Sequence, residues 1–446
     1  MRYHKGMKPR PKAPKVEEYI ANPSTDLVQV LLHSAAEANR TDRYLSWDEL
    51  RYRKPPEGLD SAAWWVGIKL HRMQARQALP LLDKKGNPFS FTVTRMMQSL
   101  LHLIDMQGGG SLHTRTPNAL NETDRNRYLM TSLMEEAIMS SLLEGAVVTR
   151  AEARELLRSN RHPINEHERM VTNNYRTMQL ILGWKDEALT PGRILSLHRS
   201  MTEGTIHQPE KAGSLRTNAD KVRIEATASG EVVHIPPPAE QLPQRLEALC
   251  TFANNDAEYM HPVLKAIVLH FWLAYDHPFI DGNGRTARAL FYWSMLKAGY
   301  WLFEYISISQ EIYKHAKSYY QAFTHSEEDE NDLNYFLTDQ LQTISQSISN
   351  LLEYLQRRTE EQKRLNDQLR NKQEFNHRQK ALLSRLLKNP DYRTSVTAHC
   401  REFQTVRQTA RTDLNSLVDA GLLLVHKEGN EFIYMPAANL KQLICS

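Results

Sequence analysis

Apolar residues recur at helical spacing through most of this chain and alternate at strand spacing in only two short stretches. Between residues 264 and 275 they return every three or four positions, which predicts a strongly apolar helix. Pro278 disfavours helical backbone at the preceding residue, so this helix is expected to end at His277. The same period resumes over residues 289–296 and predicts a second helix after a short loop.

The two alternating stretches are both typical of β-hairpins. Residues 222–235 read V-R-I, then a Ser-Gly turn, then V-V-H-I. Residues 422–435 read L-L-L-V-H, the turn K-E-G-N and E-F-I-Y-M, and they follow helical patterns around residues 382–387 and 405–418. The pattern as a whole therefore predicts a mainly α protein with two small β ribbons.

The composition is ordinary for a globular protein of two or three domains. The 446 residues are 41% hydrophobic and 24% charged, and the net charge of +4 is too small to indicate a nucleic-acid partner by itself. The three cysteines lack metal-ligand or disulfide spacing, which suits a reducing compartment. No apolar run approaches the length of a membrane span, and the basic first residues lack the apolar core of a secretory signal. We therefore expect a cytoplasmic protein without a membrane segment.

The loop between the two apolar helices carries the most specific chemistry in the chain. Residues 276–288 read D-H-P-F-I-D-G-N-G-R-T-A-R. Gly282 and Gly284, on either side of Asn283, permit positive φ and close backbone approach, and successive N–H groups then form a concave anion site. The site lies at the positive end of the second helix, which favours a phosphate.

Charged and titratable side chains surround this predicted phosphate site. Arg285 and Arg288 are three residues apart on the first helical turn, so their guanidinium groups can face the same anion. Asp281 offers a hard oxygen ligand for Mg²⁺ close to the phosphates. His277 is a candidate proton acceptor near neutral pH. The alternative is a glycine turn between two helices with a capping histidine.

The complete string resembles the signature of the Fic family, H-x-F-x-D/E-G-N-G-R-x-x-R, at every fixed position. The resemblance implies an adenylyltransferase that uses ATP and Mg²⁺ to move AMP onto a Ser, Thr or Tyr hydroxyl of a protein. It also implies that His277 is the general base and that Asp281 holds Mg²⁺. Residues 282–284 would cradle phosphate oxygens, Arg285 would bind the β-phosphate side, and Arg288 the γ-phosphate.

A second motif lies at the end of a helix predicted over residues 124–144, where the sequence reads S-S-L-L-E-G. It resembles the inhibitory motif of Fic proteins, S/T-x-x-x-E-G/N, with Ser140, Glu144 and Gly145 at the fixed positions. The resemblance implies that Glu144 pairs with Arg288 and excludes the γ-phosphate by competition. The alternative is a surface glutamate at a helix end, where the helix dipole disfavours it.

The first predicted hairpin occupies the place where Fic proteins carry a flap over the active site. An edge strand there can hold a target segment by strand addition. A plain surface hairpin is the alternative. The candidate docking positions are Val222, Ile224, Val232, Val233 and Ile235.

The last part of the chain resembles a winged helix-turn-helix. Its outward Arg407, Gln408 and Arg411 suit phosphates and base edges, so DNA is one predicted partner. The same kind of unit also serves as a homodimer or protein-docking module. The predicted organisation is a disordered basic tail over residues 1–25, an N-terminal helical region over 26–110, a Fic-type helical core with a β-hairpin flap over 111–352, an exposed helical linker over 353–375, and a winged helix-turn-helix over 376–446.

Two further functions fit the same motifs. Glu144 can orient water beside the metal, so the chain can instead remove AMP from a modified protein. A nucleotide-sensing transcription regulator is the other alternative, because the chain ends in the winged unit. The sequence identifies no target protein and no base-reading residue, so another nucleotide donor such as UTP stays open.

Overall fold

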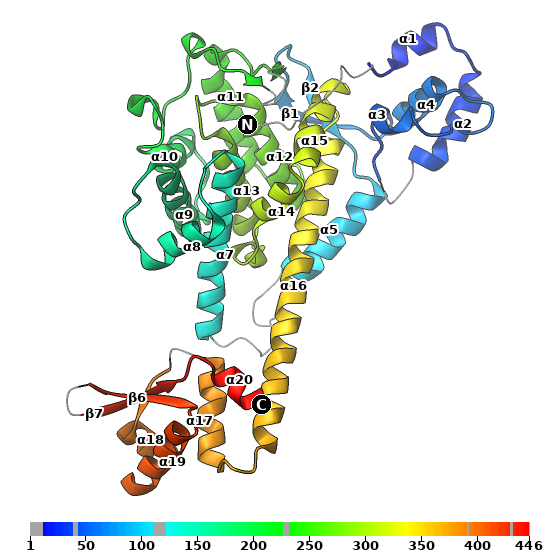
Figure 1. Cartoon of the computed structure of the whole chain (residues 1–446). Coiled ribbons are helices and arrows are strands. Elements are labelled where there is room, and N and C mark those ends of the chain that lie inside the picture. The colour runs from blue at the N-terminus through cyan, green and yellow to red at the C-terminus, as the bar shows by residue number, and fades with distance from the viewer. Residues whose placement is uncertain are drawn as a thin grey trace. The chain divides into compact units, whose positions relative to one another are not determined.

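The computed structural model describes residues 12–38, 43–109, 122–225, 232–389, 392–428 and 431–445 (Figure 1). The chain divides into two compact units. The larger comprises residues 1–116 and 126–349, and the smaller comprises residues 117–125 and 350–446. Within the described residues, no helix is both long and apolar enough to cross a membrane.

The larger unit begins with four short helices, α1 (Val16–Ala21), α2 (Leu27–Ala38), α3 (Trp47–Leu50) and α4 (Ser61–Met73). They share a core in which Trp65 is 1% exposed and packs against the ring of Trp47 at 5.9 Å. Of the basic tail expected over residues 1–25, residues 1–11 lie outside the described part. The remainder was predicted wrongly as disordered, because α1 buries Val16 and Tyr19 in this core.

The sequence pattern predicted a wholly helical N-terminal region, and this prediction is wrong in part. Residues 77–91 form an antiparallel hairpin of β1 (Gln77–Leu82) and β2 (Pro88–Phe91), followed by α5 (Arg95–Gly108). The carboxylate of Asp83 closes the turn by accepting from the N–H groups of Lys85 and Asn87 at 2.8 Å each. Phe89 of β2 packs on Phe271, which makes the hairpin part of the core beneath the candidate site. The domain boundary expected at residue 110 falls among residues 110–121, which lie outside the described part of the chain.

The remainder of the larger unit is a helical core, as predicted. Two helices, α12 and α13, lie at its centre and are buried along almost their whole length. The helices are α7 (Glu122–Leu143), α8 (Arg150–Ser159), α9 (Glu166–Trp184), α10 (Pro191–Thr202), α11 (Leu242–Asn254), α12 (Pro262–Asp276), α13 (Asn283–Lys297), α14 (Ile308–Lys314), α15 (Ala316–Glu328) and α16 (Asn334–Asn371). Both helices that the apolar periodicity predicted are thus buried on every side.

The predicted flap is a short antiparallel pair, β3 (Ile224–Glu225) and β4 (Val232–His234). Ile224 is opposite His234, and Glu225 is opposite Val232. The Ser-Gly turn predicted between them lies outside the described residues.

The smaller unit contains the end of α16 followed by α17 (His377–Lys388), β5 (Thr394–Ser395), α18 (Val396–Phe403), α19 (Arg407–Asp419), β6 (Leu423–Glu428), β7 (Glu431–Pro436) and α20 (Leu440–Cys445). Its three strands form a sheet in the order β5-β7-β6. The exposed linker expected over residues 353–375 is wrong in part. α16 continues to Asn371, and its Leu365 and Leu369 are buried in the leucine core of this unit.

Candidate active site

The loop between α12 and α13 is shaped by two residues with positive φ. His277 caps α12 with a φ of 45°, and its N–H donates to Leu273 O at 3.0 Å. Gly282 begins α13 with a φ of 77°. A side chain on Gly282 would place its Cβ 2.7 Å from Thr202 Cγ2, so both conformation and space require glycine there. The helix end predicted at His277 is confirmed.

Asn283 holds the loop through its side chain. Its Oδ1 accepts from Phe279 N–H at 2.9 Å, and its Nδ2 donates to Phe279 O at 2.8 Å. The side chain is therefore occupied, and only the backbone N–H of Asn283 is available to an anion. Phe279 itself is fully buried, which anchors the loop in the core.

His198 of α10 supports the loop from the other side, and the sequence analysis did not predict this role. Its ring stacks on Phe279 at 3.7 Å with an interplanar angle of 4°. Nδ1 accepts from Gly213 N–H and Nε2 donates to Asp281 O, both at 2.9 Å. Burial lowers the pKa of His198 to about 4, so the ring is neutral and this tautomer fits both contacts. The only signal in the sequence was a histidine on the buried face of a predicted helix.

The two arginines of the motif contact different groups. Arg285 donates to Met201 O at 3.0 Å and to Asp281 Oδ2 at 3.3 Å, and its Nε has no partner within the described residues. Arg288 points toward α7 instead. That both guanidinium groups face one phosphate stays a prediction. Asp281 lies in the loop, and its side chain is half exposed.

Arg288 makes the contact with the second motif that the sequence predicted. Its Nη2 donates to Glu144 Oε1 at 3.1 Å and to Ser140 O at 3.0 Å, and its Nε donates to Ser140 Oγ at 2.9 Å. Both side chains of the ion pair are more than nine-tenths buried. Gly145 ends the motif with a φ of 93°, so it turns the chain away after Glu144.

A second buried glutamate of α7, Glu136, binds α13 one helical turn beyond Arg288. Tyr292 of α13 donates its hydroxyl to Glu136 Oε2 at 2.8 Å. Ser307 Oγ donates to the same oxygen at 2.8 Å, and Ser309 N–H donates to it at 3.1 Å. The buried Glu136 thus anchors α7 two turns from Glu144.

Charge keeps the Glu144–Arg288 pair ionised. Burial alone would raise the pKa of Glu144, but the positive charges of Arg288 and Arg285 outweigh it and lower the pKa below its usual value. Burial would lower the pKa of Arg288, and Glu144 instead raises it. A carboxylate therefore lies at the N-terminus of α13, where an anion is favoured.

His277 has the geometry of a neutral base. Its Nδ1 lies 3.3 Å from Ala274 O, which favours the tautomer with the proton on Nδ1 and leaves the lone pair on Nε2. Burial, followed by the charge of His234, lowers the pKa of His277 to about 3. The side chain nevertheless stays partly exposed.

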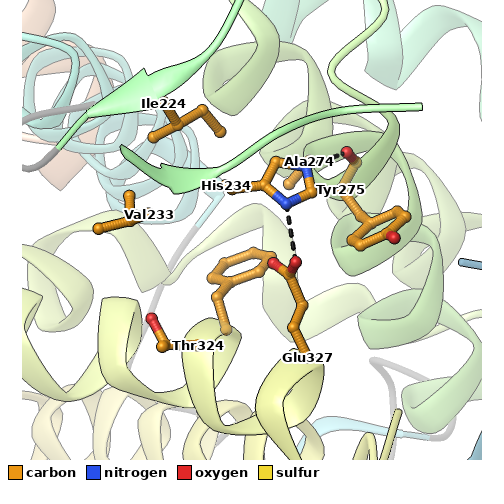
Figure 2. Close-up of a pocket in the computed structure, with 8 residues that line it drawn as sticks. Ile224, Val233, His234, Ala274, Tyr275, Thr324 and Glu327 are labelled. Carbon is orange, nitrogen blue, oxygen red and sulfur yellow. Dashed lines mark hydrogen bonds and ion pairs between the residues drawn. The ribbon is translucent and has the colours of Figure 1, made fainter. Parts of the chain in front are cut away.

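The flap lies over a small cavity, shown in Figure 2 with Ile224 and His234 on the strands and Glu327 on α15 below. The cavity has about 20 Å³, room for roughly one water molecule. Of the candidate docking positions, Val232 and Ile235 are exposed, and Ile224 is buried over this cavity. Target docking along the flap stays a prediction. Val222 lies outside both strands.

Comparison with known proteins identifies the family of the segment that holds the candidate site. Residues 188–295 match the model of the Fic/DOC family. The match includes α10, the flap, α12 and the loop of His277 and Gly282, so this part of the chain is a Fic/DOC family domain. The family predicted from the sequence motif is confirmed.

The relatives with assigned names match over this domain and its surroundings. The chain is 35% identical over 117 residues to the protein adenylyltransferase Fic of Nematostella vectensis, covering 26% of the chain and 25% of that protein. It is 31% identical over 169 residues to the protein of the same name from Drosophila ananassae, covering 35% and 31%. The chain thus spans less than a third of the length of either relative.

A solved structure shows the fold. A Fic family protein from Desulfovibrio desulfuricans G20 superposes with a TM-score of 0.51 at 18% identity, covering 78% of this chain and 97% of that one. The mainly α fold class predicted from the sequence is therefore confirmed.

Proposed function

We propose that this protein transfers AMP from ATP to a hydroxyl side chain of a target protein. The observation that carries the proposal is the carboxylate of Glu144 at the N-terminus of α13. It lies against Gly284 and pairs with Arg288, so the site already accepts a buried anion beside a cation. A phosphate carries the same charge and accepts the same hydrogen bonds.

The reacting group in this proposal is the target hydroxyl. Its oxygen attacks the α-phosphorus of ATP, the bond from that phosphorus to the bridging oxygen breaks, and pyrophosphate leaves. The Nε2 of His277 takes the hydroxyl proton, because the contact of Nδ1 with Ala274 O favours a lone pair on Nε2. The remaining contribution of the chain is positioning and charge neutralisation, as in other phosphoryl-type transfers.

Asp281 is the residue that would hold Mg²⁺. Within the described residues, no cluster of three or more His, Cys, Asp or Glu side chains forms a complete metal site. One exposed carboxylate is still a fitting donor, because Mg²⁺ in nucleotide sites keeps waters and takes its other ligands from phosphates. The ion would supply neutralisation of phosphate charge.

We further propose that Glu144 inhibits the transfer. A carboxylate that occupies Arg288 leaves no donor for the γ-phosphate, so ATP binds without the geometry required for attack. The Glu144→Gly variant should therefore label itself and its target with AMP more strongly than the native protein. Labelling from α-³²P-ATP measures this effect, and His277→Ala in the Glu144→Gly background should abolish it.

A matched control separates this effect from loss of a negative charge. Glu258 is an exposed glutamate in the loop between α11 and α12, so Glu258→Gly should leave labelling at the native level. Equal labelling of the native protein and the Glu144→Gly variant would remove the inhibitory assignment. If neither the native protein nor the Glu144→Gly variant is labelled by α-labelled ATP or by α-labelled UTP, the transferase proposal is wrong.

The same contact also suits removal of AMP. Glu144 lies beside the phosphate site and can orient a water molecule for attack on a modified hydroxyl. A target labelled in advance by the Glu144→Gly variant distinguishes the two directions. Release of AMP by the native protein but not by Glu144→Gln would favour removal as the net reaction.

A second candidate function, DNA binding, rests on the outer face of α19. Arg407 and Arg411 are exposed. Val406, which precedes the first residue of this helix, is 70% exposed. Two exposed guanidinium groups beside an apolar side chain suit phosphates and a thymine methyl group in a major groove.

The full-length protein and a random-sequence duplex test this second function. Binding should weaken as salt rises, and Arg407→Gln with Arg411→Gln should weaken it and reduce the salt dependence by about two phosphate contacts. Arg193→Gln on the larger unit is the charge control. A different outcome would assign this face to a second copy of the chain. In that case the protein does not bind DNA at low salt, and light scattering shows a dimer that the same two substitutions dissociate.

A further inference from the structure

The C-terminal end of α12 positions His277, and its backbone carbonyls need partners. The last four carbonyls of an α-helix have no partner within the helix. His277 supplies the first two contacts itself, because its N–H donates to Leu273 O at 3.0 Å and its Nδ1 lies 3.3 Å from Ala274 O. The next carbonyls, of Tyr275, Asp276 and His277, are bound by residues from the flap segment.

Arg216, which precedes β3, binds two of these carbonyls. Its Nε donates to His277 O at 2.8 Å and its Nη2 lies 3.3 Å from Asp276 O. Nη2 also donates to Pro237 O at 2.6 Å, and the N–H of Arg216 donates to Pro278 O at 2.9 Å. One buried side chain therefore joins the start of the flap, its end and the loop of the base.

His234, the last residue of β4, binds the remaining carbonyl. Its Nε2 lies 2.8 Å from Tyr275 O, and its Nδ1 lies 2.8 Å from Glu327 Oε2 of α15. Figure 2 shows the ring between these two groups, with the carboxylate directly below it. Both partners are acceptors, so both contacts are hydrogen bonds only when each ring nitrogen carries a proton. Arg216 thus places positive charge at the negative end of α12.

We propose that Arg216 and His234 are positioning residues for His277, and that the flap serves as the C-terminal cap of the catalytic helix. This inference rests on the proposed AMP transfer for its role in a reaction, and on the contacts alone for its effect on His277. The cap fixes the backbone of residues 275–277, and that backbone fixes the ring whose Nε2 accepts the target proton. A target segment bound along the flap would then contact the same element that orients the base.

The cap has a consequence that a purely structural role lacks. Loss of Arg216 leaves the carbonyls of Asp276 and His277 without donors, so the left-handed conformation at His277 is no longer enforced. The base then populates other orientations while the phosphate site of α13 stays intact. The turnover number should fall, and the KM for ATP should not change.

The first measurement uses histidine-selective ¹⁵N labelling of the full chain, with His277→Ala to assign the resonances of His277. In the native protein, His277 should show the neutral tautomer protonated at Nδ1. Arg216→Gln should shift its resonances toward a mixture of tautomers, and His234→Gln should do so to a smaller extent because Tyr275 O keeps an amide donor. Arg193→Gln removes another arginine that donates to a backbone carbonyl, that of Ala188, and should leave the spectrum unchanged.

The second measurement is AMP transfer in the Glu144→Gly background. Arg216→Gln should reduce kcat by about 10- to 100-fold, the range expected for a base displaced by an ångström, with the KM for ATP within about twofold. Arg216→Lys keeps the charge without the planar fork and should recover only part of the loss. An unchanged His277 spectrum in folded Arg216→Gln protein would overturn the inference. An inactive Glu144→Gly parent would instead overturn the proposed function and leave the spectral test valid.

Discussion

The carboxylate of Glu144 occupies the space that a side chain on Gly284 would need. A Cβ at Gly284 would lie 2.1 Å from Glu144 Oε1, closer than any non-bonded contact. Gly284 is inside α13 with helical backbone, where alanine is ordinarily more stable than glycine by about 1 kcal/mol. The absence of a side chain at Gly284 is therefore explained by Glu144, and by the phosphate that we propose to replace it.

This relationship predicts that the effect of Gly284→Ala on the free energy of unfolding changes sign when Glu144 is removed. Gly284→Ala should destabilise the native protein by about 1–3 kcal/mol, because the methyl group displaces Glu144 from Arg288 and leaves a buried charge unpaired. In the Glu144→Gly background the same substitution should stabilise by up to about 1 kcal/mol. Urea unfolding of the four proteins measures the cycle. Equal effects of Gly284→Ala in both backgrounds would show that the two residues are not coupled.

The same pair predicts a dependence on pH. The pKa of Glu144 is lowered in the folded protein by Arg288 and Arg285, so its ionised form stabilises the fold above the unfolded pKa of about 4.3. That contribution is lost as the pH falls through the folded pKa, which lies below the unfolded value. The difference in unfolding free energy between the native protein and Glu144→Gln should therefore be full at pH 7 and shrink below about pH 4. A difference that stays constant from pH 7 to pH 3 would contradict the ion pair.

Residues close together in sequence were predictable. The loop from His277 to Arg288 has its glycines, proline and arginines within a few positions, so its conformation and anion site follow from local chemistry. The contact between Glu144 and Arg288 joins residues 144 positions apart, and only the motif resemblance predicted it. The role of His198 had no such motif, because one histidine on a helix is compatible with many partners.

Errors in the predicted fold also have physical causes. The β1–β2 hairpin was read as helix because β1, Q-A-L-P-L-L, lacks a clear alternation and contains a proline. Leu365 and Leu369 were isolated on a charged helix, which suggested an exposed linker. Both leucines instead complete the core of a unit whose other leucines come from later helices. A pattern within one element does not identify a partner element elsewhere in the chain.

Gly282 provides a prediction about the loop itself. Gly282→Ala should destabilise by about 2–4 kcal/mol, since alanine is strained at a φ of 77° and its methyl group would meet Thr202 Cγ2 at 2.7 Å. Thr202→Ser removes Cγ2 and keeps the hydroxyl that donates to His198 O. In that background the cost of Gly282→Ala should fall to the conformational part, about 1–2 kcal/mol. Thermal unfolding of the cycle measures both parts, and an undiminished cost in Thr202→Ser would exclude the steric contribution.

The anchor at Glu136 predicts how α7 can be loosened without a change in the nucleotide site. Glu136→Gln keeps the oxygen that accepts from Tyr292, Ser307 and the N–H of Ser309. An amide nitrogen replaces the Oε1 that accepts from Ser309 Oγ, so this buried hydroxyl loses its acceptor at a cost of about 1–3 kcal/mol. Because α7 carries Glu144, its deuterium uptake should rise, and AMP transfer should increase partway toward the level of Glu144→Gly. Glu155→Gln on the exposed face of α8 is the matched control and should change neither. If Glu136→Gln raises deuterium uptake along α7 while labelling stays at the native level, the inhibitory contact does not depend on this anchor, and Glu144 is held by Arg288 and Ser140 alone.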